Sequence, residues 1–281
     1  MRKLVRYHVH AAAVALALFL LAIANNNIRT GRQTAAEFNS RLDMSLRNSI
    51  EWEAALDVEP NPYLLYMVRE TAALSGDARL RALLERSSRP VRATYLARLV
   101  EPNAPFIAPP PVVNTLAPYE RWIIHAISRG EYILAESDRA EMYEPNKSRT
   151  GRATHQLYSL MLQREFNGAT DTLDSVIRQL SLRIAKEAAV DFRVTDLYLQ
   201  RIAFLLAAGQ ADLVNPRWVE RALAAQEASG GWYFNWYGWG PTPYVFSPED
   251  FPNNHATAQG MWLSCLLKYK YPEWVKAHYS R

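Results

Sequence analysis

The sequence predicts an all-α protein, and three observations lead to this fold class. Apolar side chains recur every three or four residues over most of the chain, which is the period of a helix that buries one face. No stretch has the alternation of apolar and polar residues that indicates a β-strand. From residue 118 onward, strongly apolar helical segments alternate with segments that carry charge on most turns. This alternation is typical of an α/α barrel or an array of helical hairpins, in which inner and outer helices take turns.

The first segment of the chain predicts export. Three basic residues within the first six positions precede an uncharged apolar run over residues 11–24, which ends in Ala22-Ile23-Ala24. This is the order of a secretory signal peptide with a small-residue cleavage site. The run is shorter than the roughly 20 residues that span a bilayer, but two flanking residues extend it. We expect residues 1–24 to be a signal peptide or a membrane anchor, so that the body is periplasmic or held at the inner membrane by residues 9–24.

Charge and cysteine content exclude several classes of protein. The chain of 281 residues has a formal net charge of +4, and the basic residues ahead of the apolar run account for three of these charges, which leaves about +1 for residues 25–281. Nucleic acid is therefore not expected as a partner, because its binding needs a concentrated basic face. The only cysteine, Cys265, lies in an apolar run and is expected to be a small buried hydrophobe. An intrachain disulfide and a cysteine-based metal cluster are excluded.

Residues 25–117 predict a group of helices followed by a proline-rich strap. Phe38, Leu42, Leu46 and Ile50 form a helical stripe within residues 33–58. The following helices are expected to begin after the caps Asn61 and Asp77, with Gly76 ending the first of them and Pro90 the second, and to resume over Ala93 to Val100. Five prolines between residues 102 and 111 then favour an extended strap whose apolar residues are buried: Phe106, Ile107, Val112 and Val113.

Residues 118–281 predict the main helical core. Helical patterns occupy residues 119–130, 154–168, 170–191, 195–209, 215–231 and 255–272, with a polar turn region through Pro145. His125, inside the first of these patterns, is expected to be a structural histidine. Between the last two patterns lies a segment crowded with tryptophan, tyrosine, glycine and proline, which is neither helix nor strand.

This aromatic segment allows two interpretations. Flat aromatic faces stack on sugar rings, so Trp232, Trp236, Tyr237 and Trp239 are candidate carbohydrate-binding residues at the lip of a barrel. In this interpretation the acid and base of glycosidic chemistry would come from nearby carboxylates, for which the candidates are Asp191, Asp196, Glu249 and Asp250. In the alternative interpretation, the rings plug the end of the barrel.

One motif adds a resemblance to a known superfamily. Gln226, Gly230 and Trp232 stand in the spacing Q-x-x-x-G-x-W, which resembles the motif of the α/α-toroid proteins related to terpene cyclases and protein prenyltransferases. In that superfamily the glutamine caps a helix end and stacks on the tryptophan. The resemblance covers about residues 150–271 and implies a complete or partial toroid of alternating inner and outer helices. The D-x-D-D motif of the hopene cyclases and the zinc ligands of the prenyltransferases are absent from the sequence, so their activities are not implied.

Three apolar helices of this core start with polar residues: Thr154-His155, Thr195-Asp196 and Asn254-His255. If these helices are the inner ones, His155, Asp196 and His255 share one rim and form a candidate catalytic cluster. Two histidines and a carboxylate are adequate ligands for zinc, whereas the positive ends of helix dipoles favour an anion or a polar ligand. Simple helix capping is the third interpretation. The metal is left unknown, and no cofactor is indicated.

The sequence therefore predicts an exported protein with an aromatic-lipped cavity that acts on or binds carbohydrate. The alternative is a non-enzymatic, membrane-associated interaction or scaffold protein of the cell envelope. A nucleophile elbow, a phosphate-binding loop and an H-E-x-x-H motif are all absent from the sequence, which leaves open whether the protein is an enzyme. The expected partner is a glycan or another envelope component, with the membrane contacted only through the N-terminal segment.

Overall fold

The computed structural model describes residues 2–29, 33–56, 61–145, 152–233 and 252–279. In these residues all regular structure is helical, with fourteen α-helices and no β-strand, so the predicted all-α class is confirmed. The helices are α1 (Arg2–Asn27), α2 (Ala35–Ala55), α3 (Pro62–Ser75), α4 (Ala78–Ser87), α5 (Arg89–Arg92), α6 (Ala97–Val100), α7 (Pro118–Ile127), α8 (Glu136–Tyr143), α9 (Ala153–Asn167), α10 (Asp171–Val190), α11 (Asp196–Ala207), α12 (Pro216–Ala224), α13 (Asn254–Cys265) and α14 (Pro272–Tyr279). Three short helical segments join them: the 3₁₀ turns η1 (Pro111–Thr115) and η2 (Ala211–Leu213), and the π-helical turn η3 (Leu266–Lys270).

The predicted capping residues set the ends of several helices. Asn61 accepts a hydrogen bond from the backbone of Tyr63 at the start of α3, and Gly76 ends this helix in the left-handed region with φ of 68°. Asp77 caps α4 in the same way. These ends could be predicted because a cap satisfies backbone groups only a few residues away.

The region between α4 and α7 differs from the prediction. Only residues 97–100 of the helix expected over residues 93–100 are helical, as α6, because the Thr94 hydroxyl bonds the carbonyl of Val91 and accepts from the backbone of Leu96. The short helix α5 lies ahead of this range, where Pro90 was expected to end the preceding helix. Pro90 lies inside the first turn of α5, where a proline is tolerated. The proline-rich strap contains η1 and buries only part of its apolar residues, since Val113 is buried while Val112 is 57% exposed.

Helix α8 lies within the region expected to be a polar turn. Its own sequence is mostly polar, and its position depends on two tertiary contacts. Arg121 of α7 forms an ion pair of 2.7 Å with Asp138, and Met142 is fully buried. Neither contact leaves a periodic pattern in the sequence.

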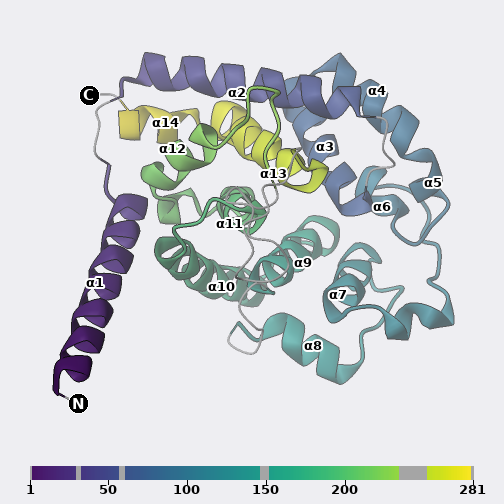
Figure 1. Ribbon diagram of the computed structural model, residues 1–281. Helices are drawn as coiled ribbons and strands as arrows, with labels where there is room; N and C mark the ends of the chain where they lie inside the picture. The colour runs from purple at the N-terminus through teal and green to yellow at the C-terminus, as the bar shows by residue number, and fades with distance from the viewer. Residues whose placement is uncertain (1, 30–32, 57–60, 146–151, 234–251, 280–281) are drawn as a thin grey trace.

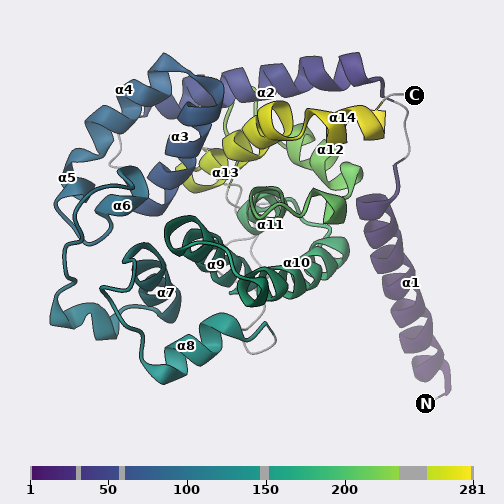
Figure 2. The same ribbon diagram turned by 180° about the vertical axis from the view of Figure 1, so that it is seen from behind.

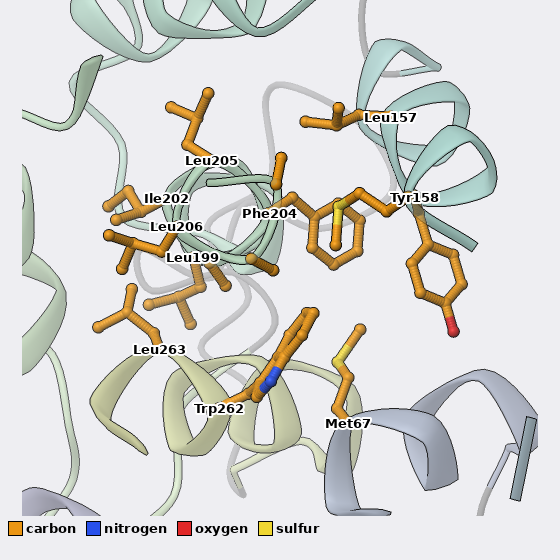
Figure 3. Close-up of a cluster of buried hydrophobic side chains, with 14 of the residues drawn as sticks. Met67, Leu157, Tyr158, Leu199, Ile202, Phe204, Leu205, Leu206, Trp262 and Leu263 are labelled. Carbon is orange, nitrogen blue, oxygen red and sulfur yellow. The ribbon is translucent and has the colours of Figure 1, made fainter. Parts of the chain in front are cut away.

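Helices with most residues buried alternate with helices that expose one face. Ten of the twelve residues of α11 and ten of the twelve residues of α13 are buried, whereas only six of the twenty residues of α10 are. Figure 1 shows α11 end-on in the middle of the body, with α9 and α10 on one side and α12 and α13 on the other. In Figure 3, the rings of Tyr158, Phe204 and Trp262 meet between these helices, with Phe204 lying 5.3 Å from Tyr158 and 5.9 Å from Trp262 between ring centroids.

Helix α1 projects from the rest of the molecule. Its C-terminal end lies against α10 and α12, and its N-terminal end points away from the body in both views (Figures 1 and 2). Residues 10–27 are long and apolar enough to cross a membrane, judged by length and composition. A signal sequence meets the same criterion.

Candidate functional site

The buried helices α9, α11 and α13 begin at the same end of the body. Thr154, near the start of α9, donates a hydrogen bond of 2.5 Å to Gln200 in the first turns of α11. His255, near the start of α13, lies 3.4 Å from the first residue of α11, Asp196, measured from Nδ1 to Oδ2. These two contacts bring the three helix starts together, and we call this end of the body the rim.

The central element of the rim is the imidazole of His255, which lies between two polar side chains. Its Nδ1 faces the Asp196 carboxylate, and its Nε2 lies 3.2 Å from the side-chain amide nitrogen of Gln259, one turn further along α13. A carboxylate at Nδ1 favours the proton on that nitrogen, so that Nε2 is left as an acceptor for the amide. The side chains of His255 and Asp196 are 35% and 17% exposed, so the pair is accessible from solvent.

His155 lies at the α7–α9 side of the rim. Its ring centroid is 4.6 Å from that of Tyr119 in α7. Of the predicted trio, Asp196 and His255 form a close pair, whereas His155 lies beside the ring of Tyr119. Among the described residues, no group of three or more histidine, cysteine, aspartate and glutamate side chains is arranged to hold a metal ion.

Trp232, a predicted sugar-stacking residue, is part of the packed interior. Its ring is 1% exposed, and its Nε1 donates a hydrogen bond of 2.8 Å to the carbonyl of Ala222 at the end of α12. Gly260 of α13 lies against the ring so closely that an added Cβ would come within 2.7 Å of it. This position suits a packing role and leaves no ring face free for a ligand. Trp236, Tyr237 and Trp239, with Glu249 and Asp250, lie outside the described residues.

The glutamine of the Q-x-x-x-G-x-W motif fastens the turn after α12. The Gln226 side-chain amide donates to the carbonyl of Gly230 at 2.8 Å and to that of Ser45 in α2 at 3.0 Å. Gly230 has φ of 99° and lies against the backbone of Asn48, where a side chain would collide. The motif therefore joins the end of α12 to α2.

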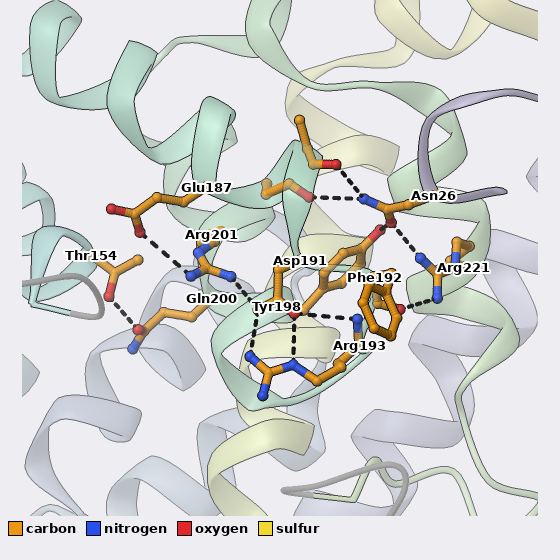
Figure 4. Close-up of polar contacts among 12 residues, drawn as sticks. Asn26, Thr154, Glu187, Asp191, Phe192, Arg193, Tyr198, Gln200, Arg201 and Arg221 are labelled. Carbon is orange, nitrogen blue, oxygen red and sulfur yellow. Dashed lines mark hydrogen bonds and ion pairs between the residues drawn. The ribbon is translucent and has the colours of Figure 1, made fainter. Parts of the chain in front are cut away.

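Asp191 belongs to a buried ionic cluster and is not a proton donor at neutral pH. Its carboxylate lies 2.8 Å from Arg201, which is 3% exposed, and 2.8 Å from Arg193 (Figure 4). Burial favours the neutral acid, but the hydrogen bonds from Arg193 and Arg201 outweigh it and lower the pKa of Asp191. Glu187 is the second carboxylate on Arg201, at 3.4 Å.

Two other residues singled out in the sequence have structural positions. His125 donates through Nδ1 to the carbonyl of Tyr132 at 2.8 Å, as expected for a structural histidine. Cys265 is buried, and burial raises the pKa of its thiol to about 12, so the thiolate is not formed at neutral pH.

The buried carboxyl group of Glu53 was missed by the sequence analysis. Glu53 is 1% exposed, and its Oε2 accepts a hydrogen bond of 2.9 Å from Asn254, the first residue of α13. Its Oε1 has no partner among the described residues. Burial raises the pKa of Glu53 to about 8, so the group is mostly protonated at neutral pH. The sequence did contain a signal for this burial. Glu53 lies three residues after Ile50, and therefore on the same face of the helix as the apolar stripe through Leu46 and Ile50.

A cavity lies next to this group. Its volume is about 580 Å³, and its lining includes Trp52 beside Glu53 in the sequence and the cap residues Asn253 and Asn254 of α13. The first turn of α13 therefore contacts Glu53 and the cavity through Asn254, and Asp196 through His255.

No protein-family model, curated protein or solved structure matches this chain. The candidate site consequently rests on the geometry of the rim.

Proposed function

We propose that this protein is an exported α/α toroid whose rim binds a glycan of the cell envelope. The observation that carries the proposal is the row formed by Asp196, His255 and Gln259 at the start of otherwise apolar helices, in which Asp196 and His255 are partly exposed and Gln259 is buried behind them. Gln259 adds a buried carbonyl oxygen, Oε1, with no partner among the described residues. Sugar hydroxyls both donate and accept hydrogen bonds, so they match a site in which both kinds of group are present.

The alternation of buried and half-exposed helices supports the toroid. In such an arrangement α9, α11 and α13 are the inner helices, and α10 and α12 are the outer ones. The shared direction of the three buried helices supports the same assignment, since inner helices of a toroid start at one end.

The rim also has a pair of groups suited to general-base chemistry on a glycan. A carboxylate that orients an imidazole is a standard arrangement for a general base. We assign His255 as the base and Asp196 as its orienting group. A non-enzymatic envelope scaffold is the second candidate, and it is favoured by the direct hydrogen bonding between the apolar helix α1 and the body.

Titration of the full-length protein in nonionic micelles with a panel of soluble oligosaccharides tests this proposal. Binding is measured by calorimetry, and cleavage by the release of new reducing ends. His255→Ala and Asp196→Asn should each weaken binding about tenfold, which corresponds to about 1.4 kcal/mol. His278→Ala and Asp171→Asn are matched controls in exposed positions of α14 and α10.

The outcomes separate the two candidates. Binding lost in both rim variants and kept in both controls supports the glycan site, and release of reducing ends adds the enzymatic function. Binding of no oligosaccharide, or equal binding by rim variants and controls, would refute the site and favour the scaffold.

A further inference from the structure

The apolar part of helix α1 is exposed around its whole circumference. Between residues 14 and 21, six large side chains are 47–65% exposed: Val14, Leu16, Leu18, Phe19, Leu20 and Leu21. Each residue of a helix turns about 100° from the one before it, so these positions point in all directions. A helix that docks into a protein groove has one apolar face and one polar face. A helix that is apolar all round has lipid as its natural surrounding.

The last turn of α1, in contrast, is built into the body. Asn26 is fully buried, and its side-chain amide donates to the carbonyls of Ala188 at 2.9 Å and Ala189 at 3.2 Å. Its Oδ1 accepts from the hydroxyl of Tyr198 at 2.9 Å and from Arg221 (Figure 4). Ala188 and Ala189 are in the last turn of α10, where carbonyl groups lack partners within the helix. Asn26 therefore caps α10 from a distant part of the chain.

The neighbouring asparagines extend this junction. Asn27 donates to Ala189 at 2.8 Å and accepts from the indole nitrogen of Trp218 at 3.0 Å. Arg217 bonds both the carbonyl oxygen of Asn25, at 3.0 Å, and its side-chain oxygen, at 3.1 Å. The apolar helix thus passes into the body without a flexible linker.

The body also contacts α1 within its apolar stretch. The ring of Phe192, in the connection from α10 to α11, lies 6.1 Å from the ring of Phe19, edge to face. Phe19 precedes Ala24 by five residues, or about 7–8 Å along a helix axis. Val190, two residues before Phe192, is 56% exposed. The corner formed by residues 190–192 consequently lies level with the apolar stretch.

We propose that α1 is a permanent transmembrane anchor and that the body lies directly on the bilayer. The corner of residues 190–192 is then embedded in the outer surface of the bilayer. The basic residues at the start of α1 orient the helix with its N-terminus in the cytoplasm. This inference extends the proposed export and is independent of the glycan site.

Fluorescence in lipid vesicles tests whether the body contacts the bilayer. Val190→Cys in the full-length chain is labelled with an environment-sensitive dye and reconstituted in vesicles of phosphatidylcholine and phosphatidylglycerol. Ala82→Cys is the control, because Ala82 is exposed and belongs to α4, which lies at the end of the body away from the N-terminal end of α1 (Figures 1 and 2). The native Cys265 is buried and protonated, so the unaltered chain is the blank. Circular dichroism checks that both variants are folded.

The label at position 190 should emit at shorter wavelength than the label at position 82, and brominated lipid should quench only the former. Equal, water-like emission at both positions would overturn the proposed contact of residues 190–192 with the bilayer. Mass spectrometry of the protein from cell membranes should find residues 1–24 intact, and a mature chain beginning at Asn25 would overturn the anchor. The oligosaccharide titration is a separate experiment. If it refutes the glycan site, the expected emission shift and the expected intact N-terminus are unchanged.

The asparagine junction is tested by the double variant Asn26→Ala, Asn27→Ala. It should remain in the membrane fraction, because the apolar run of α1 over residues 11–24 is unaltered, but it should lose the wavelength shift at position 190. If the shift persists in this variant, the asparagines do not hold the body on the bilayer.

Discussion

Replacement of Glu53 by glutamine should stabilise the protein at neutral pH. The pKa of Glu53 is about 8 in the folded chain, compared with an ordinary value of 4.5, so that folding at pH 7 requires uptake of a proton. Because the folded state holds the proton more tightly, the favourable contribution is complete below pH 4.5 and is lost as the pH rises to about 8. Over this window the free energy of unfolding falls by about 1.4 kcal/mol per pH unit.

The loss of unfolding free energy at pH 7 follows from the difference between pH 7 and the ordinary pKa of 4.5. About 2.5 pH units at 1.4 kcal/mol each give roughly 3 kcal/mol. Glutamine has the shape of the protonated acid and keeps an oxygen for the hydrogen bond from Asn254. Glu53→Gln should therefore raise the free energy of unfolding by about 3 kcal/mol at pH 7 and have little effect below about pH 4.

Urea denaturation of the full-length chain in nonionic micelles, followed by tryptophan fluorescence between pH 4 and 8.5, measures this effect. Glu51→Gln is the matched control, since Glu51 lies two residues away on the exposed face of α2, with a side chain that is 59% exposed and 3.4 Å from Arg79. The control should change stability by less than about 1 kcal/mol at every pH. A Glu53→Gln variant that is less stable at pH 7, or that keeps the pH dependence of the native chain, would refute the reasoning.

Three further variants test the packing of the core by thermal or urea denaturation at pH 7. Trp232→Ala should cost about 3–5 kcal/mol, because it removes a buried ring and the hydrogen bond to Ala222, and a cost below about 1 kcal/mol would contradict a packing role. Gly260→Ala should cost about 1–3 kcal/mol, since the new Cβ meets the Trp232 ring; an unchanged midpoint would show that the ring moves freely. Arg201→Met should cost about 3–5 kcal/mol by leaving the Asp191 carboxylate buried without this partner, whereas the exposed Arg178→Met should cost less than about 1 kcal/mol. The pKa of Asp191 is lowered in the folded state, so the cost of Arg201→Met should shrink as the pH falls and Asp191 is protonated; a cost independent of pH would argue against the ion pair.

Much of the helical framework was determined by the sequence alone. The cap Asn61, the terminating Gly76 and the apolar stripe of α2 each act within a few residues, so a single sequence contains the whole interaction. The common starting end of the buried helices was also expected from their polar first residues, and the structure brings His255 to Asp196 there. Local propensity failed where tertiary contacts decide, as in α8, which is positioned by the Arg121–Asp138 ion pair.

Only the tertiary structure decided which polar side chains are buried. Glu53 and Asn26 are surrounded by residues that are distant in the chain, and the environment of each depends on helices that pack there during folding. Their types alone would suggest exposed positions, since glutamate and asparagine are mostly found at the surface. Periodicity reports which face of a helix is covered but not what covers it. The raised pKa of Glu53 and the capping of α10 by Asn26 follow from those neighbours, and they exist only in the folded chain.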